Sequence, residues 1–307
     1  MKRRQFIHRT TLTAAGVLLG GGILTARSNP QRYKLTLLHT NDVHSRLDPF
    51  PMDGTRLQGL GGVARRAALV RKIRQEESNV LLVDAGDMLQ GTPYFNLFGG
   101  EPELSSMSAM GYDAGVLGNH DFDGGLELLD RQWHHVRFPI LNANYEVRDT
   151  VLEGRVKDMV ILERGPIRIG LFGVGIELAG LVPEGLYGGV RYQDPVAVAT
   201  RMAAQLKRQG CHLVICLSHL GYKYDSDRIS DVQLARSTEN IDIIIGGHTH
   251  TFLDQPDIVR NRVGEPVYIG QVGWAGVALG RMDIWFEKNH RGKCITCSPE
   301  LITDAFD

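Results

Sequence analysis

The chain has 307 residues, of which 43% are hydrophobic and 22% charged, and its formal net charge is -1. This composition is ordinary for a soluble globular protein, and the length is enough for one large core or two small ones. A nearly neutral chain lacks the basic excess of nucleic-acid-binding proteins, so we expect no nucleic-acid polymer as a partner.

Residues 1–30 have the pattern of an export signal and are set apart from the fold. The pair Arg3-Arg4 precedes Phe6, and an apolar, glycine-rich run extends from about residue 10 to residue 24. That run is too short and too weakly apolar for a comfortable membrane span. The arginine pair followed by phenylalanine resembles a twin-arginine signal, which directs export by the Tat route. An ordinary basic start to a general secretory signal or to a short anchor helix is the alternative.

Removal of this signal is the expectation, but the cleavage site is a poor one. Cleavage after Ala26 would place Leu24 at the −3 position, where a small residue is preferred. We therefore expect a periplasmic or extracellular protein without a membrane span once the signal is removed. It would stay anchored to the membrane if the signal is kept.

Beyond residue 30, short apolar strands alternate with helical patterns. In chain order we expect a strand at 33–39, a helix at 63–74, strands at 80–83, 114–117 and 140–141, a hairpin of 160–163 and 167–174, a helix at 196–209, and strands at 212–217, 241–245, 267–270 and 276–286. The strands are almost continuously apolar, which is typical of sheets covered on both faces. The pattern predicts an α/β fold in a single domain over residues 31–307.

The four cysteines do not predict a zinc or redox site. Cys211 and Cys216 flank an apolar strand and are expected in the core. Cys294 and Cys297 form a CxxC with no second pair and no βαβ context. A disulfide between these two remains open in an oxidising compartment.

Polar side chains suited to metal binding follow five successive buried strands. The segments are Asn41-Asp42-Val43-His44, Asp84-Ala85-Gly86-Asp87, Asn119-His120-Asp121-Phe122-Asp123, Ser218-His219 and His248-Thr249-His250. The carboxyl ends of strands in α/β sheets are where sites assemble, so we expect these segments to meet. Carboxylate, imidazole and amide ligands suit Zn, Mn, Fe or Co, and the absence of cysteine disfavours a structural zinc site.

The last of these segments carries its own prediction. His248 and His250 are one residue apart after the apolar run 241–245 and two glycines. On an extended segment, residues i and i+2 point to the same side, so both imidazoles are expected on one side, which suggests that this strand end binds metal. Thr249 between them is expected to point away.

The order of these motifs resembles that of the calcineurin-like metallophosphoesterases. Three segments are similar to sequences of the 5'-nucleotidase and UDP-sugar hydrolase branch: "LLHTNDVHSRLDPFP", "DAGDMLQGTPYFNLFGGE" and "LGNHDFDGG". The similarity extends from about Lys34 to Phe286. The resemblance implies a four-layer α-β-β-α sandwich, in which two mixed sheets are flanked by helices.

The resemblance also implies a role for each matching residue. Asp42, His44 and His250 would hold one divalent metal ion, Asn119, His219 and His248 a second, and Asp87 would bridge the two. His120 would be a catalytic histidine outside the ligand set, and Asp123 would orient it. For His39, Asp84 and Asp121 we expect structural capping or turn bonding.

The function implied is hydrolysis of phosphate monoesters such as nucleotides by a hydroxide that bridges two metals, with Mn, Zn or Fe as the metal. Exported members also include cyclic-nucleotide phosphodiesterases and a thiosulfohydrolase, which are the alternatives, and a non-catalytic metal-binding protein is a third. Full-length 5'-nucleotidases carry a C-terminal domain that recognises the base. The sequence ends at Asp307, so we expect that domain to be absent and the natural substrate to stay open. A partner protein could supply the missing specificity.

Overall fold

The computed structural model describes residues 33–287 and 293–307, with the side chains of residues 293 and 294 left out. The signal segment predicted at residues 1–30 therefore lies outside the described residues. The described residues belong to one compact unit.

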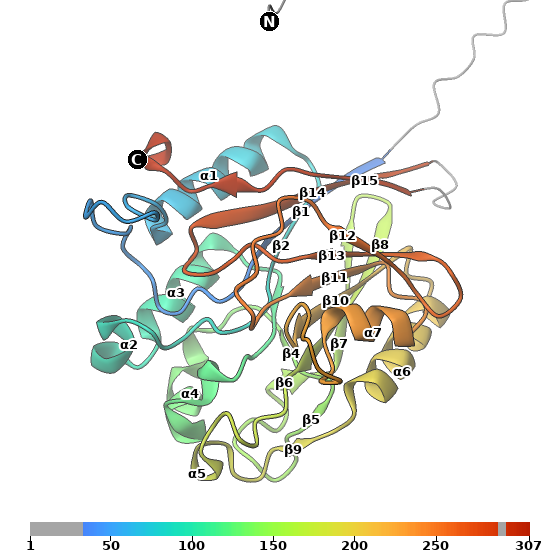
Figure 1. Ribbon diagram of the computed structural model, residues 1–307, viewed down its shortest axis with the longest axis horizontal. Helices are drawn as coiled ribbons and strands as arrows, with labels where there is room; N and C mark the ends of the chain where they lie inside the picture. Colours follow the sequence, from blue (N-terminus) through green and yellow to red (C-terminus); the bar gives the residue numbers. More distant parts are fainter. Residues whose placement is uncertain (1–32, 288–292) are drawn as a thin grey trace, which may run out of the picture. The chain divides into compact units, whose positions relative to one another are not determined.

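Two mixed sheets form the centre of the fold (Figure 1). The first sheet has, in spatial order, β15 (Lys293–Cys297), β14 (Ala278–Phe286), β1 (Tyr33–Thr40), β2 (Val80–Asp84), β3 (Ala114–Gly115), β4 (Ile140–Leu141) and β6 (Val156–Lys157), with β16 (Glu300–Leu301) also on β14. The second has β12 (Asp257–Arg260), β13 (Pro266–Gly270), β11 (Ile243–Gly246), β10 (Leu213–His219), β8 (Ile167–Gly175) and β7 (Met159–Arg164). A small third sheet pairs β5 (Tyr145–Glu146) with β9 (Arg191–Tyr192).

Helices cover the outer faces of the two large sheets, as Figure 1 shows. The helices are α1 (Val63–Glu76), α2 (Pro93–Phe98), α3 (Glu101–Met110), α4 (Gly125–Gln132), α5 (Glu184–Tyr187), α6 (Pro195–Arg208) and α7 (Asp231–Ser237), with the 3-10 turns η1 (His120–Phe122), η2 (Trp133–His135) and η3 (Asp304–Phe306). Side chains of α1, α3 and α4 pack on the first sheet, and those of α6 and α7 pack on the second.

The two sheets pack against each other through a third apolar cluster. Leu35, Leu81 and Ile284 from the first sheet meet Ile215 and Ile245 from the second, and none of these side chains is exposed. A strand in such a sheet is buried on both faces, which is why β2 and β10 have apolar residues at nearly every position. The predicted four-layer α-β-β-α sandwich is confirmed.

The parallel strands determine where the site is built. β1, β2 and β3 run parallel in the first sheet, and β8, β10, β11 and β13 run parallel in the second. Their carboxyl ends carry the polar segments singled out in the sequence, and loops of this kind collect ligands in α/β folds.

Most predicted elements are present, and two of them differ in extent. The strand expected at 114–117 is only two residues long. The helix expected from residue 196 starts at Pro195, because the Asp194 side chain accepts a hydrogen bond from the Val196 N–H and caps it. Helices α2, α3, α4, α5 and α7 were not predicted.

Cys211 and Cys216 are buried in the core, as expected. Cys297 is free and half-buried, and the side chain of Cys294 lies outside the described residues.

Candidate metal centre

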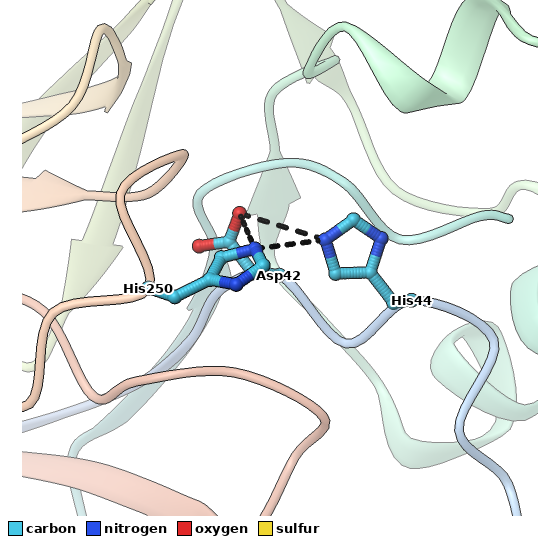
Figure 2. A group of neighbouring side chains, drawn as sticks. All are labelled: Asp42, His44 and His250. Carbon is cyan, nitrogen blue, oxygen red and sulfur yellow. Dashed lines mark hydrogen bonds and ion pairs between the residues drawn. The ribbon is translucent and has the colours of Figure 1, made fainter. Parts of the chain in front are cut away.

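Two groups of candidate metal ligands form at the carboxyl ends of the strands. Asp42, His44 and His250 make the first group, and Asp87, His219 and His248 make the second. Within each group, one ligand atom from every residue lies within 4.8 Å of the others. Figure 2 shows the first group, with the two imidazoles and the carboxylate turned toward one another. The structure therefore brings together six of the seven ligands expected from the sequence.

The first group joins residues from opposite ends of the chain. His44 Nε2 lies 3.0 Å from His250 Nε2, and Asp42 Oδ1 lies 3.5 Å from His250 Nε2 (Figure 2). The Asp42 carboxylate is fully buried and accepts hydrogen bonds from the His248 N–H, at 2.9 and 3.0 Å, and from Asn41 Nδ2, at 2.6 Å. These bonds hold the carboxylate still while one oxygen faces the histidines.

Asp87 lies between the two groups. Its Oδ2 atom is 3.0 Å from His219 Nε2 and 3.7 Å from His44 Nε2, so one carboxylate oxygen faces a histidine of each group. The seventh expected ligand, Asn119, belongs with the second group, because its Oδ1 atom lies 2.8 Å from His248 Nδ1. The position of Asp87 between the two groups is the one that a carboxylate bridging two metals would need.

The ring nitrogens of His219 indicate that a cation fits the second group. His219 Nδ1 lies 2.7 Å from the Ala85 carbonyl oxygen, so Nδ1–H donates a hydrogen bond to that oxygen and Nε2 is the ring nitrogen left to face Asp87. Nε2 is buried, has no hydrogen-bond partner and faces the Asp87 carboxylate. Burial alone would lower the pKa of His219, but the Asp87 carboxylate raises that pKa to about 10. Two electron-rich atoms at this separation call for a positive charge between them, either a proton or a metal ion.

The backbone at the site is strained in a way the sequence analysis did not foresee. Asp42, His44, Asp87, His248 and His250 all have positive φ, between 49° and 72°. Non-glycine residues rarely adopt this conformation, which costs on the order of 1–3 kcal/mol each and concentrates at functional sites. These five residues are all among the seven expected ligands.

This backbone corrects the reasoning about the GGHTH segment. β11 ends at Gly246, and His248 and His250 follow in a left-handed turn instead of an extended strand. Their rings lie in the two different groups to which the family resemblance assigned them. Thr249 is held by the Tyr222 N–H, which donates to its Oγ1 atom at 2.9 Å.

His120 and Asp123 form a hydrogen-bonded pair beside the two groups. His120 Nδ1 lies 2.7 Å from Asp123 Oδ2, since the 3-10 turn η1 places residues i and i+3 on one side. The backbone N–H of His120 donates to Asp87 Oδ1 at 2.8 Å, and its ring centroid lies 5.2 Å from that of His44. Burial lowers the pKa of His120, but the Asp123 carboxylate outweighs it and the pKa is raised. His120 is thus close to the ligands without belonging to either group.

Two aspartates expected to cap turns do so within the site. Asp121 is buried, and its carboxylate accepts hydrogen bonds from the backbone N–H groups of Gly118, Asp87 and Leu89 at 2.8 to 3.0 Å. Asp84 accepts from Thr40 Oγ1 at 2.6 Å and from the Gly86 N–H at 2.8 Å. Asp121 therefore also fixes the backbone of the bridging carboxylate, a role that sequence reasoning missed.

Trp274 is a site neighbour with no signal in the sequence. Its ring stacks on His250, with centroids 5.6 Å apart and planes inclined by 8°. Phe50 packs edge-on against Trp274 at 5.9 Å. His39, by contrast, is buried against Gly270 and Gly280, and its Nδ1 atom has no hydrogen-bond partner among the described residues, so the capping or turn bonding expected of it is not seen at that atom.

The two covered sheets and the two groups of candidate ligands at their strand ends occur together with a match to a known family. Residues 35–252 match the family model "Calcineurin-like phosphoesterase". The chain belongs to the calcineurin-like phosphoesterase family.

Known proteins place the chain near the 5'-nucleotidases of that family. It is 35% identical to the snake venom 5'-nucleotidase of Gloydius brevicauda over 276 residues, which are 83% of this chain and 46% of that protein. The 5'-nucleotidase precursor from Thermus thermophilus has a similar structure, with a TM-score of 0.81, 30% identity, and coverage of 89% of this chain and 55% of that one. The calcineurin-like phosphoesterase YfkN from Bacillus subtilis matches with a TM-score of 0.70 and 28% identity, covering 89% and 92%. The chain thus spans about half the length of the 5'-nucleotidases it matches.

Proposed function

We propose that this chain is a two-metal phosphoesterase that hydrolyses phosphate monoesters such as nucleotides. One observation carries the proposal: the Asp87 carboxylate lies between two imidazole-bearing ligand groups, beside a histidine that belongs to neither. The named activity of its 5'-nucleotidase relatives supports the substrate class.

The residues present fit two divalent cations. Asp42, His44 and His250 would hold one, Asn119, His219 and His248 the other, and Asp87 both. When bound, such cations supply positive charge to the phosphate oxygens and lower the pKa of a water molecule. The protein contributes fixed ligand positions, because strained backbone and buried hydrogen bonds leave these side chains little freedom.

His120 would assist departure of the alcohol. Asp123 accepts a hydrogen bond from the Nδ1–H of His120, so Nε2 of the protonated ring would donate its proton to the leaving oxygen. The backbone N–H of His120 is already bound to Asp87, so this histidine cannot drift from the ligand groups. Asn119, on the residue before, would help to position the phosphate.

Export by the Tat route is part of the proposal, with residues 1–30 as the signal and 31–307 as the catalytic domain. The Arg3-Arg4 pair supports it. In the described residues, no helix is long and apolar enough to cross a membrane. Replacing both arginines by lysine should leave the protein in the cytoplasm; unchanged export would exclude this route.

The export route affects which metals the site would receive. A Tat substrate leaves the cytoplasm folded and can be loaded there, which makes Mn or Fe as plausible a choice as Zn. Elemental analysis of protein purified from its native compartment tests this, and a Zn-only result would contradict cytoplasmic loading with Mn or Fe.

The test of the activity is hydrolysis by purified protein, first stripped of metal and then supplied with Mn, Zn, Co or Mg. The substrates are p-nitrophenyl phosphate, bis-p-nitrophenyl phosphate and AMP. We expect activity on monoesters only with metal present, lost in Asp87→Asn and kept in Asp158→Asn, an exposed carboxylate control. Faster hydrolysis of the diester would make the protein a phosphodiesterase instead. No hydrolysis with any metal would refute the proposal.

A further inference from the structure

An apolar cavity of about 620 Å³ is lined in part by Trp274, the ring that stacks on His250 of the first ligand group. It is bounded by the loop that carries Leu57, by the chain just after His250, including Phe252, by Trp274, and by Leu301 of β16. The volume lies within the range of small-molecule sites, which are mostly apolar with a few polar groups. Neither ligand group includes any of these lining residues.

One residue, Trp274, contacts both the cavity and the first ligand group. Trp274 lines the cavity and also stacks on His250, at 5.6 Å between ring centroids. His250 in turn lies 3.5 Å from Asp42. Phe252, two residues along the chain from His250, lines the same cavity. An ester whose phosphate sits at the ligand groups would therefore have the cavity within reach of its alcohol portion.

The lining favours a flat aromatic group. Phe252 is 48% exposed and Leu301 is 56% exposed, although both side chains are large and apolar. Exposed apolar side chains gathered around a hollow mark binding sites, and aromatic rings bind well to other ring faces. Arg56 and Asp254 also line the cavity, and neither makes an ion pair within the described part of the chain. One donor and one acceptor are thus free to bond the edge of a heterocycle.

We propose that this cavity binds the aromatic ring of the alcohol portion of the phosphate ester, and so selects ring-bearing esters such as nucleotides. This inference rests on the proposed function for the position of the phosphate. It places recognition of the ring inside the catalytic domain, between Trp274, Phe252 and Leu301.

Adenosine is the probe, because it has the ring and lacks the phosphate. Its binding to metal-free protein would be measured by ligand-observed NMR titration, which requires neither metal nor hydrolysis. In parallel, kcat/KM would be measured for AMP and for ribose 5-phosphate, which lacks the ring. The variants are Leu301→Glu and Phe252→Ala. Ile258→Glu is the matched control, since Ile258 on β12 is also 56% exposed and does not line the cavity.

We expect wild type and Ile258→Glu to bind adenosine saturably. Leu301→Glu and Phe252→Ala should weaken that binding about tenfold or more, and lower kcat/KM for AMP by a similar factor. Their kcat/KM for ribose 5-phosphate should stay within about twofold of wild type, because the phosphate site is untouched.

Three results would overturn the inference. These are no saturable adenosine binding by wild type, binding unchanged in Leu301→Glu, and an equal loss of kcat/KM for AMP and ribose 5-phosphate. The first would leave the cavity as a surface for another chain segment or protein. The last would mean that the substitutions act through His250. Adenosine binding without hydrolysis of any ester would instead refute the proposed function and keep the ring site.

Discussion

Gly118→Ala probes the junction of the two ligand groups with a single methyl group. A Cβ atom on Gly118 would lie 2.2 Å from Asp87 Oδ1 and 2.6 Å from both Cε1 and Nε2 of His219. Gly118 does not have positive φ, so alanine can adopt its backbone conformation. The substitution therefore acts only through steric contact of the new methyl group with the Asp87 carboxylate and the His219 ring.

The size of the effect follows from these distances. Real Cβ atoms essentially never lie closer than 3.0 Å to such a neighbour, so the Asp87 carboxylate must retreat by roughly 0.8 Å from the 2.2 Å contact. Asp87 is only 1% exposed and is held by Asp121 through its backbone, so it has little room to move. A misplacement near 1 Å costs about 10²-fold in rate, and disturbed support of a metal ligand about 10–100-fold in metal affinity.

The assay measures metal content by elemental analysis after dialysis, metal affinity by titration, and kcat/KM for AMP. Gly185→Ala is the control, because a Cβ there meets nothing within 4 Å. We expect Gly185→Ala to behave as wild type. If Gly118→Ala kept both metals at wild-type affinity and hydrolysed AMP at the wild-type rate, the Asp87–His219 junction could not be the bridge between two metals.

Three further predictions concern separate parts of the molecule. His120→Ala should lower kcat about 10²–10⁴-fold while elemental analysis finds the metal retained; lost metal would overturn its role outside the ligand set. Adding Mn²⁺ to metal-free protein should raise the melting temperature in calorimetry, and Asp87→Asn should remove that rise, since only the folded state holds the ligands together. Burial raises the pKa of Asp283, but hydrogen bonds, including those from Lys34 and Arg281, outweigh it and the pKa falls below 3.8. This carboxylate then stabilises the fold above about pH 4, and that contribution is lost as pH falls through the lowered pKa. Asp283→Asn should cost up to about 1 kcal/mol at pH 7 in urea unfolding and nothing near pH 2, and an equal cost at both values would contradict this.

Much of the fold was predictable because its signals are local. The apolar runs of β1, β2, β10 and β11 indicate buried strands by themselves, and the hairpin of β7 and β8 follows from its turn. The strand predicted at 114–117 was too long, because only two residues of this apolar run, those of β3, pair with neighbouring strands. Helices α2, α3, α4, α5 and α7 were not predicted.

The residues of the candidate site could also be predicted from local signals, but their backbone conformation could not. The position of a residue at the carboxyl end of a buried strand can be read from the sequence, which is how Asp42, His44 and Asp87 were found. The left-handed backbone at His248 and His250 could not be read this way, because it depends on contacts such as the bond from the His248 N–H to Asp42.

The sequence by itself determined the fold class, the layered sheets and the set of side chains that gather at the strand ends. Strand burial and strand ends depend on neighbours along the chain, and these are present in the sequence. The tertiary structure alone decided that the ligand residues adopt a left-handed backbone, that Asp121 supports Asp87, and that Trp274 stacks on His250. His44 and His250 are 206 positions apart, and they meet only because two sheets pack face to face. Distances of that kind are set by packing between layers, which no local pattern records.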